Sequence, residues 1–177
     1  MKVRKMEFLT EAQEQCYNQI REMLESLFGD DVVPREDVPV FGLHMGSALA
    51  EAVVYPWAED DAVVTTRAYV VRGAEVTADL MRFLLQENDK LRFGGFGIDE
   101  DGDIFFQHAI VGSTADPEEL RASLLAVVIT ADEYDDKIIE KYGGQSALDF
   151  IKEALEEIQL QLDETDADTE EAATPAK

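Results

Sequence analysis

The stretch Leu91–Val111 most constrains what this chain folds into, because two apolar, aromatic-rich runs flank the dipeptide Asp101-Gly102. A two-residue type I′ turn needs a positive φ at both central residues, and Asp-Gly is one of the few pairs that adopt it readily. The sequence therefore predicts a β-hairpin with Asp101-Gly102 at its tip. In that register Gly97 faces Phe106 across the two strands, with the aromatic ring lying over the glycine.

Both faces of this predicted hairpin are apolar, because side chains alternate between the two sides of a strand. One face carries Phe96, Ile98, Phe105, Ala109 and Val111, and the other carries Phe93, Ile104, Phe106 and Ile110. The protein core covers one face. The second needs a helix, a partner subunit or a bound peptide, and this favours a binding function over a catalytic one.

The remaining elements follow from apolar periodicity and end signals. A helix runs between Thr10 and Gly29, strands cover Val38–Met45, Leu49–Trp57 and Ala62–Val71, a second helix covers about Val76–Lys90, a third runs from Pro117 to Gly143, and a last one starts after Ser146. The order α-β-β-β-α-β-β-α-α predicts an α+β fold, with an antiparallel five-stranded sheet and flanking helices. We expect residues 1–162 to form a single domain and residues 163–177 a disordered acidic tail.

The last predicted helix has a coiled-coil-like seam. Its apolar residues are Leu148, Ile151, Leu155, Ile158 and Leu162, which follow a strict 3-4 spacing. Together with the second hairpin face, this seam is more apolar surface than one thin α+β layer buries. The sequence therefore predicts a homodimer.

The net charge and the cysteine content exclude several classes of partner and an internal disulfide. The chain has 15 basic and 39 acidic residues and a net charge of −24. Nucleic acids and anionic membranes repel such a surface, so we expect neither as a partner. Cys16 is the only cysteine, which rules out an internal disulfide. With no apolar run of membrane-spanning length, a cytoplasmic location is expected.

No residue pattern predicts an enzyme, a metal site or a cofactor. The acidic stretch Asp99–Asp103 suggests a calcium loop, but an EF-hand counted from Asp99 places Ile104 where glycine is needed and Ile110 where glutamate is needed. We interpret the stretch as a solvated hairpin tip. His44 and His108, the only histidines, have no identifiable catalytic partner at a fixed spacing.

Three segments carry a family resemblance. The sequence Phe96–Ile104 (FGIDEDGDI), followed by Glu119-Leu120 and then Thr130–Asp136 (TADEYDD), resembles the YbjN-like family, which is related in fold to the type III secretion (Tir) chaperones. The resemblance covers roughly Leu80–Tyr142. It implies a small homodimeric chaperone-like protein that binds peptides or regulates a partner, without catalysis.

Two groups of residues are candidates for binding. The first group is aromatic and is expected to line a client groove, with core packing as the alternative for each residue: Trp57, Tyr69, Phe93 and Phe106. The second group is acidic and is expected either to form a solvated helix face or to dock lysines and arginines of a partner: Asp132, Glu133, Asp135 and Asp136. Two functions stay open: a chaperone-like protein that binds a protein or peptide client, and an acidic regulatory protein that sequesters a basic partner by charge. Salt separates them, because screening weakens only the second.

Overall fold

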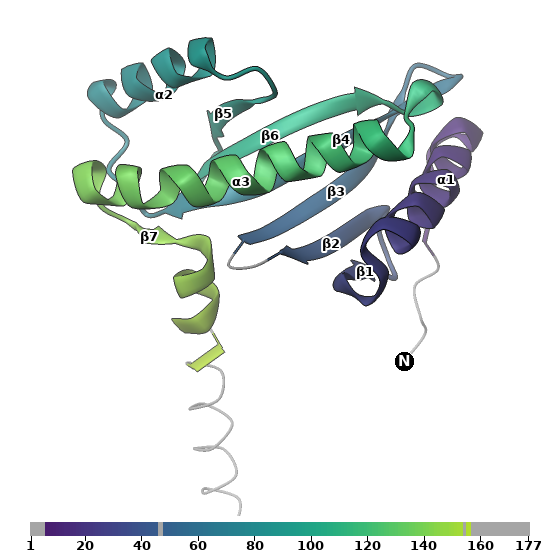
Figure 1. Cartoon of the computed structure of the whole chain (residues 1–177), viewed down its shortest axis with the longest axis horizontal. Coiled ribbons are helices and arrows are strands. Elements are labelled where there is room, and N and C mark those ends of the chain that lie inside the picture. The colour runs from purple at the N-terminus through teal and green to yellow at the C-terminus, as the bar shows by residue number, and fades with distance from the viewer. Residues whose placement is uncertain (1–5, 46–47, 154, 157–177) are drawn as a thin grey trace, which may run out of the picture.

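The helices α1 (Glu11–Phe28) and α3 (Pro117–Tyr142) lie across one face of an antiparallel sheet, and α2 (Ala78–Lys90) packs at one end of it (Figure 1). This computed structural model describes residues 6–45, 48–153 and 155–156. Among these residues, no helix is both long enough and apolar enough to cross a membrane.

The sheet runs in the order β1-β2-β3-β4-β6-β5, and β7 pairs with the end of β4. The strands are β1 (Val32–Pro34), β2 (Val40–Met45), β3 (Ala48–Trp57), β4 (Asp61–Arg72), β5 (Gly95–Ile98), β6 (Ile104–Val111) and β7 (Gln145–Ser146). The predicted α+β fold with an antiparallel sheet is confirmed. The sheet has seven strands in the described part of the chain rather than five, because the short strand β1 pairs with β2 at one edge and the short strand β7 pairs with the last residues of β4.

Helix ends lie where the capping residues predict them. The side-chain oxygens of Thr10 and Asp116 accept hydrogen bonds from the backbone N–H of Gln13 and Glu119, and these bonds satisfy free donors at the starts of α1 and α3. Gly143 ends α3 with a φ of +73°. The last predicted helix is present at residues 147–153 and 155–156. Ile158, Leu162, the turn at Gly46-Ser47 and the predicted tail lie outside the described residues.

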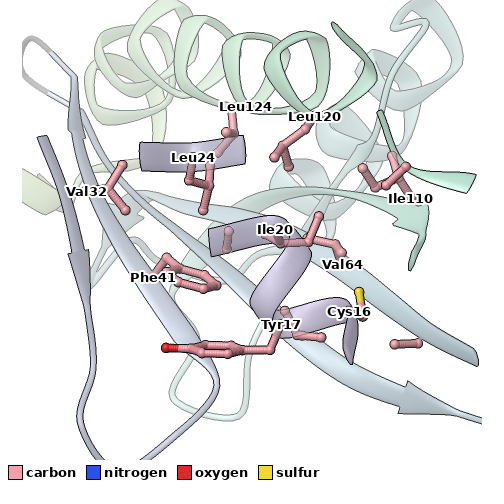
Figure 2. Packing of buried hydrophobic residues seen from close by; sticks show 14 of the residues in the cluster. Cys16, Tyr17, Ile20, Leu24, Val32, Phe41, Val64, Ile110, Leu120 and Leu124 are labelled. Atoms are coloured by element: carbon pink, nitrogen blue, oxygen red, sulfur yellow. The ribbon is translucent and has the colours of Figure 1, made fainter. Parts of the chain in front are cut away.

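Two apolar clusters fill the space between the helices and the sheet. In the first, Ile20 and Leu24 of α1 meet Phe41 and Val64 of the sheet and Leu120 of α3 (Figure 2). In the second, α2 and α3 cover β4, β5 and β6, through Leu80, Leu84, Val70, Phe96, Ile104, Phe106, Val127 and Ile138. Because α3 contributes to both clusters, it joins the two ends of the sheet.

The predicted hairpin forms, but its predicted register is wrong by one residue. Phe96 pairs with Phe106, and Gly97 pairs with Phe105. Gly102 alone takes a positive φ (+86°) at the tip, and its N–H donates to the carbonyl of Asp99 at 3.1 Å. The Asp99 carboxylate also accepts from the N–H of Asp101 and Asp103. The Asp99 side chain thus stabilises a loop that is one residue longer than the predicted two-residue type I′ turn. The additional loop residue shifts the pairing of β5 with β6 by one position.

The shifted register changes which side chains share a face. Phe96, Ile98, Ile104 and Phe106 lie together on the helix side, where they form part of the core. Phe105 lies on the opposite face, and a Cβ atom at Gly97 would overlap its ring. The predicted aromatic ring over Gly97 is therefore present, but it belongs to Phe105 rather than to Phe106.

Candidate functional site

One face of the sheet is left open by α1, α2 and α3. In β4, residues Ala62, Val64, Thr66, Ala68 and Val70 are buried, and the alternate residues point to the other side and are only partly covered. The same alternation in β1 and β3 exposes Val33 by 64%, Tyr55 by 51% and Trp57 by 52%. We call this side of the sheet the open face. Large exposed apolar side chains gathered on one side of a fold are typical of a binding surface.

A groove of about 420 Å³ lies at one end of the open face. The floor and rim come from β1 to β4, and residues Ala147 and Ile151 of the C-terminal helix form a wall. The sheet residues that line it are Val33, Gly42, Leu43, Leu49, Ala50, Glu51, Arg67, Tyr69 and Arg72. The lining is mostly apolar, with a few polar groups, which is the usual composition of a ligand groove.

Two arginines border this groove, each stacked on aromatic rings. The guanidinium of Arg67 lies 3.8 Å from the centre of the Phe105 ring and donates to Gln107 Oε1 at 2.8 Å. The guanidinium of Arg72 lies 4.2 Å from the Phe150 ring centre and 4.9 Å from that of Tyr69. These contacts are cation–π interactions.

The pair formed by Arg72 and Asp103 joins three parts of the chain. Arg72 Nε lies 2.7 Å from Asp103 Oδ2, in the hairpin loop. Because Arg72 also stacks on Phe150, it ties β4 and this loop to the C-terminal helix. Nearby, the Tyr69 hydroxyl donates to Asp99 Oδ2 at 3.1 Å. Burial raises the pKa of Tyr69, and Asp99 raises it further.

The structure does not bring the four predicted aromatic residues together. Trp57 and Tyr69 belong to the open face. Phe93 is 52% exposed and lies on the helix side, where its ring meets the edge of His108 at 5.5 Å between ring centres. Phe106 is 0% exposed and packs against Phe96 in the core. It therefore offers no accessible surface in this fold.

The predicted acidic residues lie on α3. Asp132, Asp135 and Asp136, together with Asp149 of the C-terminal segment, line a small cavity of about 210 Å³, and Glu133 is exposed beside it. Burial raises the pKa of Asp135, and the neighbouring Asp136 and Asp132 raise it further. The described part of the chain holds no group of three or more side chains arranged to bind a metal ion.

The thiol of Cys16 is buried and the imidazole of His108 is partly buried. Burial raises the pKa of Cys16 to about 11, with a smaller contribution from Asp61, so this thiol is a weak nucleophile at neutral pH. His108 Nδ1 lies 2.8 Å from Ser123 Oγ, which is itself 1% exposed and bonds to Thr66. Desolvation lowers the pKa of His108, against a smaller opposing effect of Glu119.

Sequence reasoning missed the groove and most of its residues. Gly42, Arg67 and Ile151 lie on β2, β4 and the C-terminal helix, and only the three-dimensional fold brings them together. One signal was available in the sequence: Gly42 interrupts a strand pattern, and a glycine inside a strand often marks a place where another group approaches closely.

Comparison with solved structures shows the fold. The structure resembles a chain in the crystal structure of the ExsC–ExsE complex, with a TM-score of 0.56, 15% identity, and coverage of 73% of this chain and 97% of that chain. It also resembles a chain in the structure of the HopA1–SchA chaperone–effector complex, with a TM-score of 0.54, 9% identity, and coverage of 70% and 96%. A search of curated proteins found no match.

Comparison with protein families is more specific. The family model described as "T3SS (YopN, CesT) and YbjN peptide-binding chaperone 1" matches residues 14–150. The matched range includes α2, α3, every strand that the structure describes, and all of α1 except its first three residues. Because the match spans well over half of the chain, the protein belongs to this family of type III secretion and YbjN peptide-binding chaperones.

Proposed function

We propose that this protein binds extended segments of a client protein on the open face of its sheet, as a non-enzymatic, chaperone-like protein. The observation that carries the proposal is the exposure of Val33, Tyr55 and Trp57 on a face that α1, α2 and α3 leave uncovered. Aromatic side chains bury a large area for little loss of conformational entropy, which suits them as anchors for a peptide. Membership of a peptide-binding chaperone family supports the same function.

Of the residues selected from sequence, Trp57 and Tyr69 are the ones we propose as client contacts. Phe93 is exposed on the other side of the sheet, so a contact there needs a client that passes around the edge formed by β5. Phe106 is left out of the proposed surface because its side chain is fully buried.

We further propose that the acidic side chains of α3 dock lysines or arginines that flank the client segment. Asp132, Asp135 and Asp136 border one cavity, and the chain as a whole has a net charge of −24. The second candidate function, sequestration of a basic partner by charge alone, rests on the same two observations. The two differ in salt dependence, because apolar contacts on the open face are not screened.

The homodimer expected from sequence remains part of the proposal, with α2 as the contact surface. Met81 is 45% exposed, Leu85 is 70% exposed, and both border a hollow beside the edge strand β5. Exposed apolar side chains that gather beside a hollow are a common contact surface for a second subunit. A cytoplasmic location fits the single free cysteine.

A peptide selection tests the client function. Random peptides displayed on phage are selected on the full chain, and the binders are measured by calorimetry against wild type, Tyr55→Ser and Trp57→Ser. We expect each substitution to weaken binding about tenfold or more, as for aromatic anchors at an interface. Ile129→Ser is the matched control, because Ile129 is 52% exposed on α3, away from the open face.

Two results would contradict this proposal. The first is a failure to select any peptide. The second is a set of binders whose affinity is the same for wild type, Tyr55→Ser and Trp57→Ser. Affinity that collapses between about 0.1 and 1 M salt, where charge interactions are screened, would instead favour sequestration by charge.

A further inference from the structure

Gly42 creates space in the floor of the groove. It lies in β2 on the open face, paired with Val33 of β1 and Glu51 of β3. A Cβ atom added at Gly42 would find Val33 O as its nearest neighbour, at 3.7 Å, an ordinary van der Waals contact. The fold itself therefore has room for a side chain here. Glycine weakens a strand, so its presence at this position is explained best by a ligand that needs the space.

Contacts through Arg72 connect the wall of the groove to the sheet. Ile151 and Ala147 face the groove from the C-terminal helix, and Phe150 of the same helix stacks on Arg72. Arg72 is fixed in turn by its ion pair with Asp103. The apolar wall and the floor at Gly42 thus form a recess of about 420 Å³, lined mostly by apolar groups that suit apolar side chains of an extended peptide.

Arg67 gives the groove a charge preference. Arg21, Arg35, Arg72, Arg82 and Arg121 each form an ion pair with an aspartate or glutamate. Arg67 instead donates two hydrogen bonds to the neutral amide oxygen of Gln107 while its guanidinium lies over Phe105. A carboxylate is a stronger acceptor for a guanidinium than an amide is, so Arg67 is set up to bind one.

We propose that the groove binds an apolar client segment that carries an aspartate or glutamate, whose carboxylate pairs with Arg67. This inference rests on the proposed function and adds to it the location of one subsite and the chemistry of its ligand. Glu51 disfavours binding of a client carboxylate at this subsite. Its side chain belongs to the residue paired with Arg67 across β3 and β4, and it also lines the groove. A client carboxylate at Arg67 is repelled by Glu51.

The test uses peptides selected from the phage-displayed library, each synthesised together with a variant whose acidic residue is replaced by the corresponding amide. We expect selected sequences to combine apolar residues with aspartate or glutamate. Arg67→Gln should weaken binding of the acidic peptide about tenfold or more, the value of a charged hydrogen bond. It should leave the amide peptide little changed. Glu51→Gln should strengthen binding of the acidic peptide.

Gly42→Val tests the floor of the groove. Valine suits a strand, and its side chain fills the recess, so binding should fall tenfold or more while the melting temperature is kept. Arg121→Gln is the matched control for charge, because Arg121 pairs with Glu118 on α3, away from the groove. If Gly42→Val fails to fold, Gly42→Ala and Arg67→Gln test the groove in its place. We expect Gly42→Ala to lose less peptide affinity than Gly42→Val, because alanine fills less of the recess.

The outcomes separate this inference from the proposed function. Peptides that depend on Tyr55 and Trp57 but bind Gly42→Val and Arg67→Gln like wild type would overturn the groove and leave the open face as the client surface. Selected peptides that lack aspartate and glutamate would overturn the preference for a carboxylate, whether or not they carry the lysines or arginines expected to dock on α3. If no peptide is selected at all, both proposals are wrong.

Discussion

At the scale of single residues, Phe106 shows how one register shift moves an aromatic ring from a candidate binding surface into the core. Its ring is fully buried and lies 4.9 Å from that of Phe96, between ring centres. Replacing it with alanine removes a large buried side chain and leaves a cavity. We expect Phe106→Ala to lower the free energy of unfolding by about 3–5 kcal/mol.

Denaturant melts followed by circular dichroism measure this loss. Phe93→Ala is the matched control: its ring is 52% exposed, so the same substitution should cost about 1 kcal/mol or less. Equal stability of the two variants would show that Phe106 is not a core residue.

Asp61 gives a prediction about pH. Its carboxylate accepts from the Ser113 hydroxyl at 2.6 Å and from the N–H groups of Ala62 and Ser113, and these bonds lower its pKa below the ordinary value of 3.8. A carboxyl with a lowered pKa stabilises the fold above its ordinary pKa, and this contribution is lost as the pH falls through the folded value. Asp61→Asn should therefore lose stability less steeply than wild type between about pH 4 and pH 2. Parallel acid titration curves would contradict this.

At the scale of elements, Asn88 fastens α2 to the edge strand β5. Its side-chain oxygen accepts from the N–H of Phe96 at 2.7 Å, and its amide donates to the carbonyl of Phe96 at 3.2 Å. An edge strand lacks a neighbour on one side, so this side chain takes the place of a further strand. Asn88→Ala should speed hydrogen exchange at the Phe96 amide by about tenfold or more, the effect of losing roughly one net hydrogen bond.

Nuclear magnetic resonance measures that exchange residue by residue. The Phe106 amide, in the adjacent strand β6, provides the internal reference and should change less. If the two amides respond alike, Asn88 acts on the stability of the whole domain rather than on β5.

The elements themselves could be predicted from sequence because their signals are local. Thr10, Asp116 and Gly143 mark helix ends through hydrogen bonds to residues a few positions away, and alternation of buried residues marks β4. The register of β5 and β6 could not be predicted, because it depends on how the Asp99 carboxylate holds its loop. The strands β1 and β7 are too short to show a pattern and form only by pairing with β2 and β4.

At the scale of the whole molecule, two apolar areas of the described surface outside the open face could be covered by a second copy. One is the stripe on α2 with Leu85, and the other is the C-terminal helix with Leu155, which is 60% exposed. If the proposed dimer forms through α2, we expect Leu85→Asp to convert it to a 19.8 kDa monomer, because the substitution places a charge in the contact. Leu155→Asp should remain dimeric.

Sedimentation equilibrium distinguishes the cases. A monomeric Leu155→Asp beside a dimeric Leu85→Asp would move the interface to the seam predicted from sequence. A monomeric wild type would remove the dimer from the proposed function.

The candidate site is likewise a property of the whole molecule, and only part of it could be predicted from the sequence. Composition and the hairpin indicated a binding protein, and Trp57 and Tyr69 were identified from sequence and lie on the open face. The groove was not predictable, because its lining comes from β1 to β4 and from a helix that starts after Ser146. Its shape depends on Arg72, which stacks on Phe150 across 78 residues of sequence, the difference between the two residue numbers.

The position of Trp57 makes the open face visible to spectroscopy without any label. It is the only tryptophan in the chain, and its indole is half exposed at the end of β3. All indole emission therefore originates from the proposed client surface. A segment that covers this face excludes water from the ring, so the emission shifts to shorter wavelength as binding proceeds. A ligand that occupies only the acidic side of α3 leaves the spectrum unchanged, so a single titration of the unlabelled protein reports whether the Trp57 end of the open face has been covered.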